Sequence, residues 1–171
     1  MQPKKGPILT KLDECRSEKS QYWIMKSEPN AYSIDDLKND KVTPWDGIRN
    51  YQARNLMMNE MKVKDTVLFY HSNAKPPGVV GIATISKPAF PDPEQFNAKS
   101  KYFDAKSPKD QPRWWCVEVK YKKKLKKIVT LDSLKENPKL EDMLVVQRGQ
   151  RLSILPITEN EYTEIIQMSQ D

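Results

Sequence analysis

A short buried strand that ends in a polar turn is predicted by the stretch Tyr22-Trp23-Ile24-Met25-Lys26-Ser27-Glu28-Pro29. Its first four residues form an apolar run of strand length. The following Glu28-Pro29-Asn30 is typical of a turn. Lys26 and Ser27 therefore stand at a strand end, and strand ends of a small sheet are natural walls for a binding pocket. Ordinary turn chemistry explains the same residues equally simply.

Further strands are predicted along the chain by short apolar runs and by alternation of apolar and polar residues. They cover Thr66–Tyr70, Val79–Ile85, Trp114–Tyr121 and Arg151–Leu155. Within the third of these, Trp115, Val117 and Val119 are expected to face the core together because strand side chains alternate with a period of two. Pro156 is expected to end the last strand. Residues 87–112 carry five prolines and predict a long loop, a kind of segment that is often functional.

Short helices are predicted between these strands by their capping residues. Ser33 with Asp36, and Thr158 with Glu161, have capping-box spacing, and Thr130 is placed to cap a helix over Leu131–Glu136. Another helix is expected over residues 51–61. Short strands and helices are mixed without regular strand–helix–strand alternation, which argues against a doubly wound sheet. We expect an α+β fold: a mostly antiparallel, curled sheet or small barrel with short peripheral helices.

The composition is that of one soluble basic domain. The chain has 171 residues and a formal net charge of +6, from 29 Lys and Arg against 23 Asp and Glu. This charge favours a polyanionic partner without proving one. Residues 1–20 predict a flexible tail, because their charges are mixed and Pro3, Gly6 and Pro7 interrupt them. They contain no signal-peptide core, no run is long enough to span a membrane, and the two cysteines form no paired motif. We therefore expect an intracellular monomer with no membrane contact.

Most of the motifs that mark catalytic chemistry are missing from the sequence. His71 is the only histidine, and it lies beside no nucleophile motif. One His and two distant Cys do not make a metal site. No phosphate-binding glycine motif is present. The sequence therefore predicts no metal, no cofactor and no catalytic residue, and an enzyme is the weaker hypothesis.

The most specific polar segment is Trp45-Asp46-Gly47-Ile48-Arg49-Asn50-Tyr51-Gln52-Ala53-Arg54-Asn55. A flat aromatic ring can stack on a base, and a neighbouring carboxylate can accept hydrogen bonds from exocyclic amino groups. Arg49 and Arg54 can pair with phosphate. The alternative is that Trp45 packs in the core and both arginines lie on a helix surface. The polar stretch Tyr70-His71-Ser72-Asn73 ends another strand and is a second candidate pocket wall.

A lysine cluster follows the Trp114–Tyr121 strand. Residues 120–127 include six lysines in eight positions. Lysines in such a run can contact phosphates and would then supply affinity and salt dependence without sequence information. A solvated strand end and turn is the alternative reading of the same pattern.

Taken together, these motifs resemble the EVE domain family. The resemblance is carried by residues 22–29, 43–55, 69–73 and 77–83, and it continues through Pro112-Arg113-Trp114-Trp115 and Arg151-Leu152-Ser153-Ile154. It spans about residues 21–168, so residues 21–171 are taken as the domain. The family implies a PUA-like pseudo-barrel related to YTH domains. It also implies binding of modified nucleobases, chiefly modified cytosines in DNA.

The resemblance places Ser27, Trp45 and Asp46 at the base-reading position, and either Tyr102 or Phe103 at a second aromatic wall. The full expected base pocket comprises Lys26, Ser27, Trp45, Asp46, Asn50, Tyr70, His71, Ser72 and Tyr102. The expected phosphate contacts are Arg49, Arg54, Arg113, Lys122, Lys123, Lys124, Lys126 and Lys127. DNA is the expected partner, in the cytoplasm of a bacterium or the nucleus of a eukaryote. A reader of modified RNA, or an enzyme with Asp46 as general base, remains the alternative.

Overall fold

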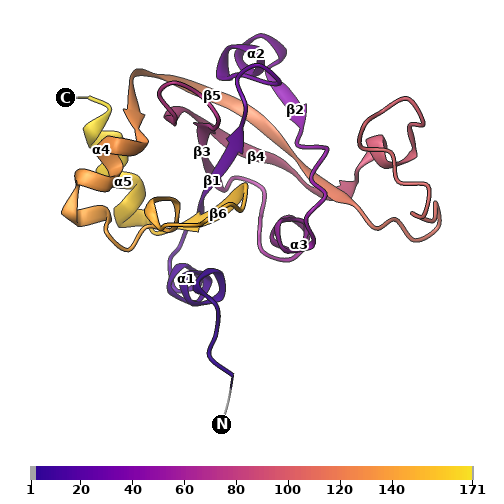
Figure 1. The fold of residues 1–171 in the computed structure, drawn as a ribbon, viewed down its shortest axis with the longest axis horizontal. Coiled ribbons are helices and arrows are strands. Elements are labelled where there is room, and N and C mark those ends of the chain that lie inside the picture. Colours follow the sequence, from indigo (N-terminus) through magenta and orange to yellow (C-terminus); the bar gives the residue numbers. More distant parts are fainter. Residues whose placement is uncertain (1–2, 171) are drawn as a thin grey trace.

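A computed structural model describes residues 3–170 of the chain, which fold around one sheet (Figure 1). In this range the sheet has six strands in the order β2-β5-β4-β3-β1-β6. They are β1 (Tyr22–Ser27), β2 (Val42–Pro44), β3 (Thr66–His71), β4 (Gly78–Pro91), β5 (Trp115–Thr130) and β6 (Ile154–Ile157). Only β1 and β3 pair in parallel among these strands. The mostly antiparallel α+β sheet is therefore confirmed, and it stays open, with β2 and β6 at its edges.

Five α-helices and three short 3-10 helices surround the sheet within residues 3–170. The α-helices are α1 (Pro7–Arg16), α2 (Ile34–Asp40), α3 (Tyr51–Asn59), α4 (Leu131–Glu136) and α5 (Glu159–Met168); the 3-10 helices are η1 (Pro93–Phe96), η2 (Pro138–Leu140) and η3 (Leu144–Val146). The predicted caps at Ser33, Thr130 and Thr158 are confirmed. None of these helices combines the length and apolar character that a bilayer span requires.

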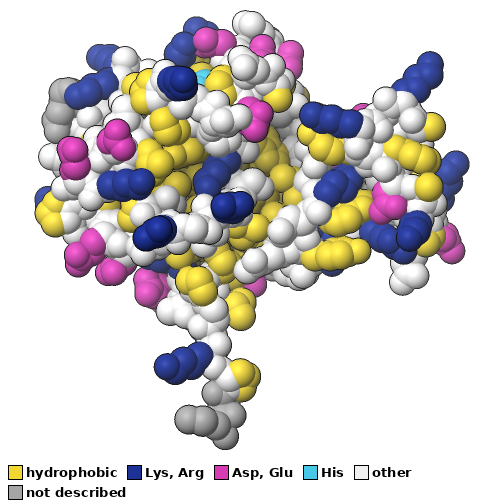
Figure 2. Space-filling model, in the orientation of Figure 1, with side chains coloured by type: hydrophobic (Ala, Val, Ile, Leu, Met, Phe, Trp, Pro, Cys, Tyr) yellow, Lys and Arg dark blue, Asp and Glu magenta, His cyan; other side chains and the backbone are white. Residues whose placement is uncertain are grey.

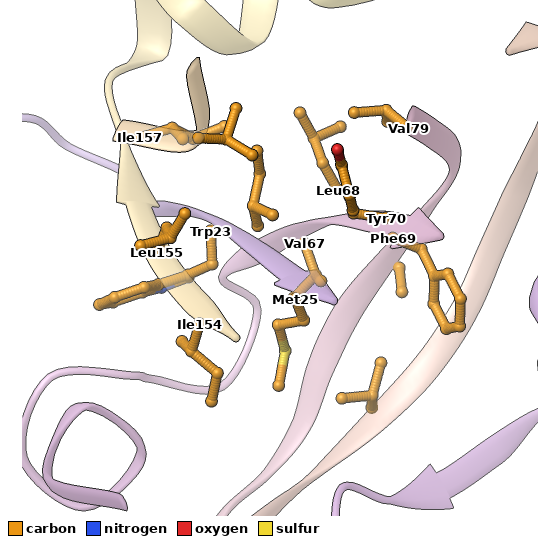
Figure 3. Close-up of a cluster of buried hydrophobic side chains, with 14 of the residues drawn as sticks. Trp23, Met25, Val67, Leu68, Phe69, Tyr70, Val79, Ile154, Leu155 and Ile157 are labelled. Atoms are coloured by element: carbon orange, nitrogen blue, oxygen red, sulfur yellow. The ribbon is translucent and has the colours of Figure 1, made fainter. Parts of the chain in front are cut away.

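The core is centred on β1 and β3 (Figure 3). Each strand has a run of consecutive buried residues, as expected for central strands that are covered on both faces. Trp23 is buried among them, and its indole N–H donates to the Asp65 carboxylate at 3.0 Å. A buried polar group in this position needs such a partner.

Strands β4 and β5 are longer than the sequence predicts, and they reach residues 91 and 130. The ladder between them shifts register repeatedly, including on both sides of Lys87. Such bulges accept residues that cannot join a regular ladder, which is why Pro88 does not end the strand. The lysine cluster thus lies on a continuous strand rather than in a turn. Val117 and Val119 are buried as predicted, whereas Trp115 is only half-buried.

Two predictions near the ends of the domain are wrong. The last strand is Ile154–Ile157 instead of Arg151–Leu155, and Pro156 lies inside it. Proline is tolerated there because β6 is an edge strand.

The predicted flexible tail contains helix α1, which begins at Pro7. Its buried residues Ile8 and Leu12 join the core, and the Lys11 ammonium lies 3.1 Å from the Glu161 carboxylate of α5. This helix could not be predicted from the sequence, because it has few apolar residues and the residues that it packs against are distant in the chain.

Candidate functional site

One face of the domain contains a large open cavity of about 1290 Å³. Six segments meet around it: the end of β1, the turn before α2, β2 with the loop after it, the turn after β3, the loop that carries Lys101 and Tyr102, and the chain before β6. Figure 2 shows this face hollowed in its middle, with hydrophobic side chains exposed there between Lys and Arg side chains. The lining includes Lys26, Ser27, Tyr32, Trp45, Asp46, Ser72, Lys101, Tyr102, Arg151 and Ser153.

Trp45 forms part of the cavity wall and also belongs to the core. Its backbone N–H donates to the Val117 carbonyl at 2.8 Å, which continues the β2–β5 pairing by one residue. Its ring meets the Phe69 ring edge-on, with 5.6 Å between centroids. Only 7% of the residue is exposed. The two alternatives for Trp45 are therefore both partly correct: the ring packs on the core from behind and borders the cavity in front.

The loop that follows Trp45 is held by a fully buried carboxylate, Asp92. One of its oxygens accepts from the Gly47 N–H at 2.8 Å and from the Arg49 guanidinium at 2.9 Å. Its other oxygen accepts from the Glu94 N–H at 2.8 Å. Asp92 thus fixes the Trp45–Arg49 loop to the chain after β4. Sequence reasoning missed this residue, because an isolated Asp in a proline-rich loop carries no motif.

Gly47 and Arg49 together position Tyr102, the second aromatic side chain of the cavity wall. Gly47 has φ +81°, and a Cβ on it would lie 2.7 Å from the Tyr102 ring, so only glycine allows this contact. The Arg49 guanidinium donates to the Tyr102 carbonyl at 2.7 and 3.1 Å. Arg49 also donates to the Ile48 carbonyl and to Asp92. The sequence predicts that Arg49 contacts phosphate, but in the structure its guanidinium donates four hydrogen bonds to acceptors within the protein.

Asp46 and Lys26 give the cavity two charged groups of opposite sign. Burial by the cavity walls, together with the Asp92 and Glu94 carboxylates, raises the pKa of Asp46 to about 6, although Arg49 partly opposes this. Burial lowers the pKa of the Lys26 ammonium, which lies 5.9 Å from the Tyr70 ring centroid. Ser27, which also lines the cavity, donates its hydroxyl to the Tyr32 carbonyl at 2.6 Å and keeps its oxygen as an acceptor. The cavity can therefore offer hydrogen-bond donors and acceptors to one flat ligand.

Three residues predicted for this pocket do not line it. The Asn50 side chain caps α3 by accepting from the Ala53 N–H at 3.0 Å. Tyr70 is buried in the core, and burial raises the pKa of its hydroxyl to about 12. The His71 Nε2 accepts from the Ile34 N–H at 3.1 Å and so fixes the start of α2 to β3. The structure instead adds Tyr32, Lys101, Arg151 and Ser153 to the lining.

The predicted phosphate contacts occupy two regions outside the cavity. Arg54 belongs to α3 and donates to the carbonyl of Arg113, which lies just before β5, at 2.8 Å. The lysines of residues 122–127 lie along β5, and Lys124 already pairs with Asp35 of α2 at 2.8 Å. Among residues 3–170, no group of three or more His, Cys, Asp or Glu side chains is arranged to hold a metal ion.

Comparison with known proteins places this arrangement in a family. The EVE domain family model matches residues 21–168, and the chain therefore belongs to the EVE domain family. The rat thymocyte nuclear protein 1 is 37% identical, with 94% of this chain and 79% of the rat protein aligned. A solved hypothetical protein from Leishmania major is 42% identical with a TM-score of 0.85, covering 91% of this chain and 98% of that one.

Two further similar structures were solved with nucleic acid bound. The human THYN1 protein was solved in complex with DNA containing 5-methylcytosine. It is 37% identical, has a TM-score of 0.81, and is matched over 89% of this chain and 99% of its own. The YTH domain of Zygosaccharomyces rouxii MRB1, solved with N6-methyladenosine RNA, has a TM-score of 0.51 at 17% identity over 90% of this chain and 88% of its own. This second likeness confirms the expected YTH-related fold.

Proposed function

We propose that this protein binds DNA and holds one modified cytosine, turned out of its base stack, in the cavity beside Trp45. The observation that carries the proposal is the meeting of an aromatic wall, Trp45 and Tyr102, with Asp46 and Lys26 in one open cavity. The human relative solved with 5-methylcytosine DNA supports the choice of base and of nucleic acid.

The polar groups of the cavity suit the hydrogen-bonding edge of cytosine. Cytosine presents an amino group as donor, and its ring nitrogen and carbonyl oxygen are acceptors. The Asp46 carboxylate can accept from the amino group, and the Lys26 ammonium can donate to the acceptors. A methyl group on the ring would find apolar surface on the aromatic side chains.

The size and charge of the cavity suit a nucleotide that remains part of a strand. Its volume of about 1290 Å³ exceeds the roughly 300–1000 Å³ of typical small-ligand pockets. The extra space leaves room for the sugar and phosphates, and Lys101 and Arg151 are lining residues with cationic ends. The net charge of +6 adds attraction to a polyanion. We expect the protein to act where DNA is held: in the nucleus of a eukaryotic cell or in the cytoplasm of a bacterium.

Binding to matched oligonucleotides tests this function. Fluorescence anisotropy would compare 5-methylcytosine, cytosine and thymine at one position, in DNA and in RNA of the same sequence. We expect the DNA with 5-methylcytosine to bind most tightly, and Asp46→Ala to reduce the preference for cytosine over thymine. A wild-type protein that binds all of these strands equally would overturn the proposal. Preference for the RNA would assign the site to a modified RNA base instead.

One observation keeps an enzyme as a second candidate. A carboxylate with a pKa raised to about 6 suits a general base. Incubation of the protein with the same modified oligonucleotides, followed by mass spectrometry, separates the two functions. A reader leaves every mass unchanged, whereas an enzyme that acts on the base changes the mass of the modified strand, and Asp46→Asn abolishes that change.

A further inference from the structure

A stack of two aromatic rings lies at the start of α3, outside the cavity. The rings of Tyr51 and Trp114 are nearly parallel, at 18°, with centroids 4.9 Å apart. The Arg54 guanidinium lies 4.6 Å from the Tyr51 ring centroid and 5.9 Å from that of Trp114. The guanidinium therefore contacts both rings of the stack. Tyr51 is nevertheless 52% exposed, so part of its ring surface is accessible to a ligand.

The inner half of this stack is held rigidly by polar contacts. The Trp114 indole N–H donates to Asp104 at 2.8 Å, and its backbone N–H donates to the buried Gln95 side chain at 3.0 Å. Trp114 is thus fixed without help from Tyr51. The exposed ring of Tyr51 makes a flat apolar surface that is supported from behind and flanked by a cation. This is the arrangement of a stacking platform for a base.

Arg49 connects this platform to the cavity. Its guanidinium lies 5.5 Å from the ring centroid of Tyr102, which lines the cavity, and 5.2 Å from that of Trp114. The same short loop also carries the chain from Trp45 in the cavity wall to Tyr51. The surroundings are positively charged, because Arg54, the half-exposed Arg113 and the exposed Lys101 lie on this side. Figure 2 shows Lys and Arg among exposed hydrophobic side chains on the part of the surface formed by α3 and by the loop of residues 92–114.

We infer that Tyr51 stacks on the base next to the one held in the cavity, with Arg54 and Arg113 close to the phosphate between the two nucleotides. The inference rests on the proposed function and extends it from one nucleotide to two. Turning a base out of a strand costs a few kcal/mol, because both it and its neighbour lose stacking. A platform beside the cavity restores the stacking of the neighbour and so stabilises the bound form.

The test combines a variant of the platform with removal of the neighbouring base. Anisotropy would be measured on single-stranded DNA with 5-methylcytosine, either intact or with an abasic site on the 5′ or the 3′ side. Tyr51→Ala should weaken binding to the intact strand about 10-fold or more, from the loss of one stacked base. On one of the two abasic strands, Tyr51→Ala and wild type should bind equally. Tyr51→Phe keeps the ring and should resemble wild type.

A matched control removes exposed apolar surface from the same helix without touching the stack. Met58, two turns further along α3, is exposed, and Met58→Ala should leave every affinity within about twofold of wild type. The inference is overturned if Tyr51→Ala binds the intact strand like wild type, or if its defect persists on both abasic strands. Failure of the proposed function would look different: the wild-type protein would then show no preference for the modified base.

Discussion

Asp46 combines a proposed role in base recognition with a cost to stability, and the pH dependence of both can be measured. Its pKa is raised to about 6 in the folded protein, above its ordinary value of 3.8. The folded state therefore holds this proton more tightly than the unfolded state, so its contribution favours folding below about pH 4 and is lost as the pH rises through 6. We predict that Asp46→Asn raises the melting temperature at pH 7 but changes it little at pH 4.

The same substitution should impair base discrimination at pH 7, because a neutral amide accepts from the cytosine amino group less strongly than a carboxylate does. Thermal melting across pH 4–8 and anisotropy at pH 7 would check the two effects. An equal shift in melting temperature at both pH values would show that burial, rather than ionisation, decides the stability of this variant.

Trp45 illustrates why stacking and packing must be measured separately. Because the ring is nearly buried against Phe69, Trp45→Ala should lower the free energy of unfolding by about 3–5 kcal/mol as well as abolish stacking. Trp45→Phe should fold with a smaller loss and weaken binding by several-fold, since a smaller ring gives less stacking surface. Urea denaturation and anisotropy on both variants would check this. If Trp45→Phe binds like wild type, the additional surface of the indole contributes nothing to stacking.

Six of the nine predicted pocket residues line the cavity, and the exceptions have specific causes. Lys26, Ser27 and Ser72 could be predicted because strand ends converge at one side of a sheet. Asn50 and His71 could not be excluded, because a cap or a hydrogen bond to a distant backbone N–H depends on packing. Arg151 and Ser153 reach the cavity only because β6 pairs with β1, more than a hundred residues earlier in the sequence.

At the scale of elements, the loop between β2 and α3 is held in place by Asp92. This residue begins the segment of residues 92–114, which connects β4 to β5. Asp92→Asn would leave the half-buried Arg49 without its ion-pair partner and weaken the bond to the Gly47 N–H. We predict a loss of about 3 kcal/mol in the free energy of unfolding. Binding should also weaken, because both Trp45 and Tyr102 lose their fixed positions.

Denaturation in urea, compared with Asp110→Asn, checks the role of this anchor. Asp110 is exposed in the same segment, and its change should cost less than 0.5 kcal/mol, roughly the range of ordinary surface substitutions. Equal stability of the two variants would contradict the prediction.

Helix α1 offers the clearest contrast between sequence and structure among the elements. Its residues gain order through contacts with distant parts of the chain, among them β6 and the buried Lys11–Glu161 pair with α5. We predict that Lys11→Met destabilises the protein by about 3 kcal/mol, because it leaves the buried Glu161 carboxylate without its cationic partner. Adding Glu161→Gln should recover part of this loss, whereas Lys19→Met on the exposed segment after α1 should cost little. Chemical denaturation would check all three; a neutral Lys11→Met would indicate that the Lys11–Glu161 pair adds no net stability.

At the scale of the whole molecule, the sheet brings the lysine cluster close to the cavity. Strand β2 leads into Trp45 and pairs with β5, with Val42 opposite Lys120. The cluster therefore starts beside the strand that carries the cavity loop, and it continues along β5 past α2. Most strands of the sheet could be predicted from the sequence. The closeness of the lysine cluster to the cavity could not, because it depends on β2, a three-residue strand without an apolar pattern. A bound strand could extend from the cavity along this side of the sheet.

The salt dependence of binding tests whether the lysines touch that strand. Each phosphate contact contributes about one unit to the slope of log affinity against log salt. We predict that replacing Lys122, Lys123 and Lys126 together by Ala flattens the slope by about 2–3 units; Lys124 is left in place because Asp35 already pairs with it. Lys4, Lys19 and Lys135 are exposed and lie outside the cluster, so their triple replacement makes the same change in net charge. The control should lower affinity slightly and keep the slope. Equal slopes for the two triple variants would show that the cluster is only a solvated face, and that the cavity and its arginine-flanked platform bind the strand without it.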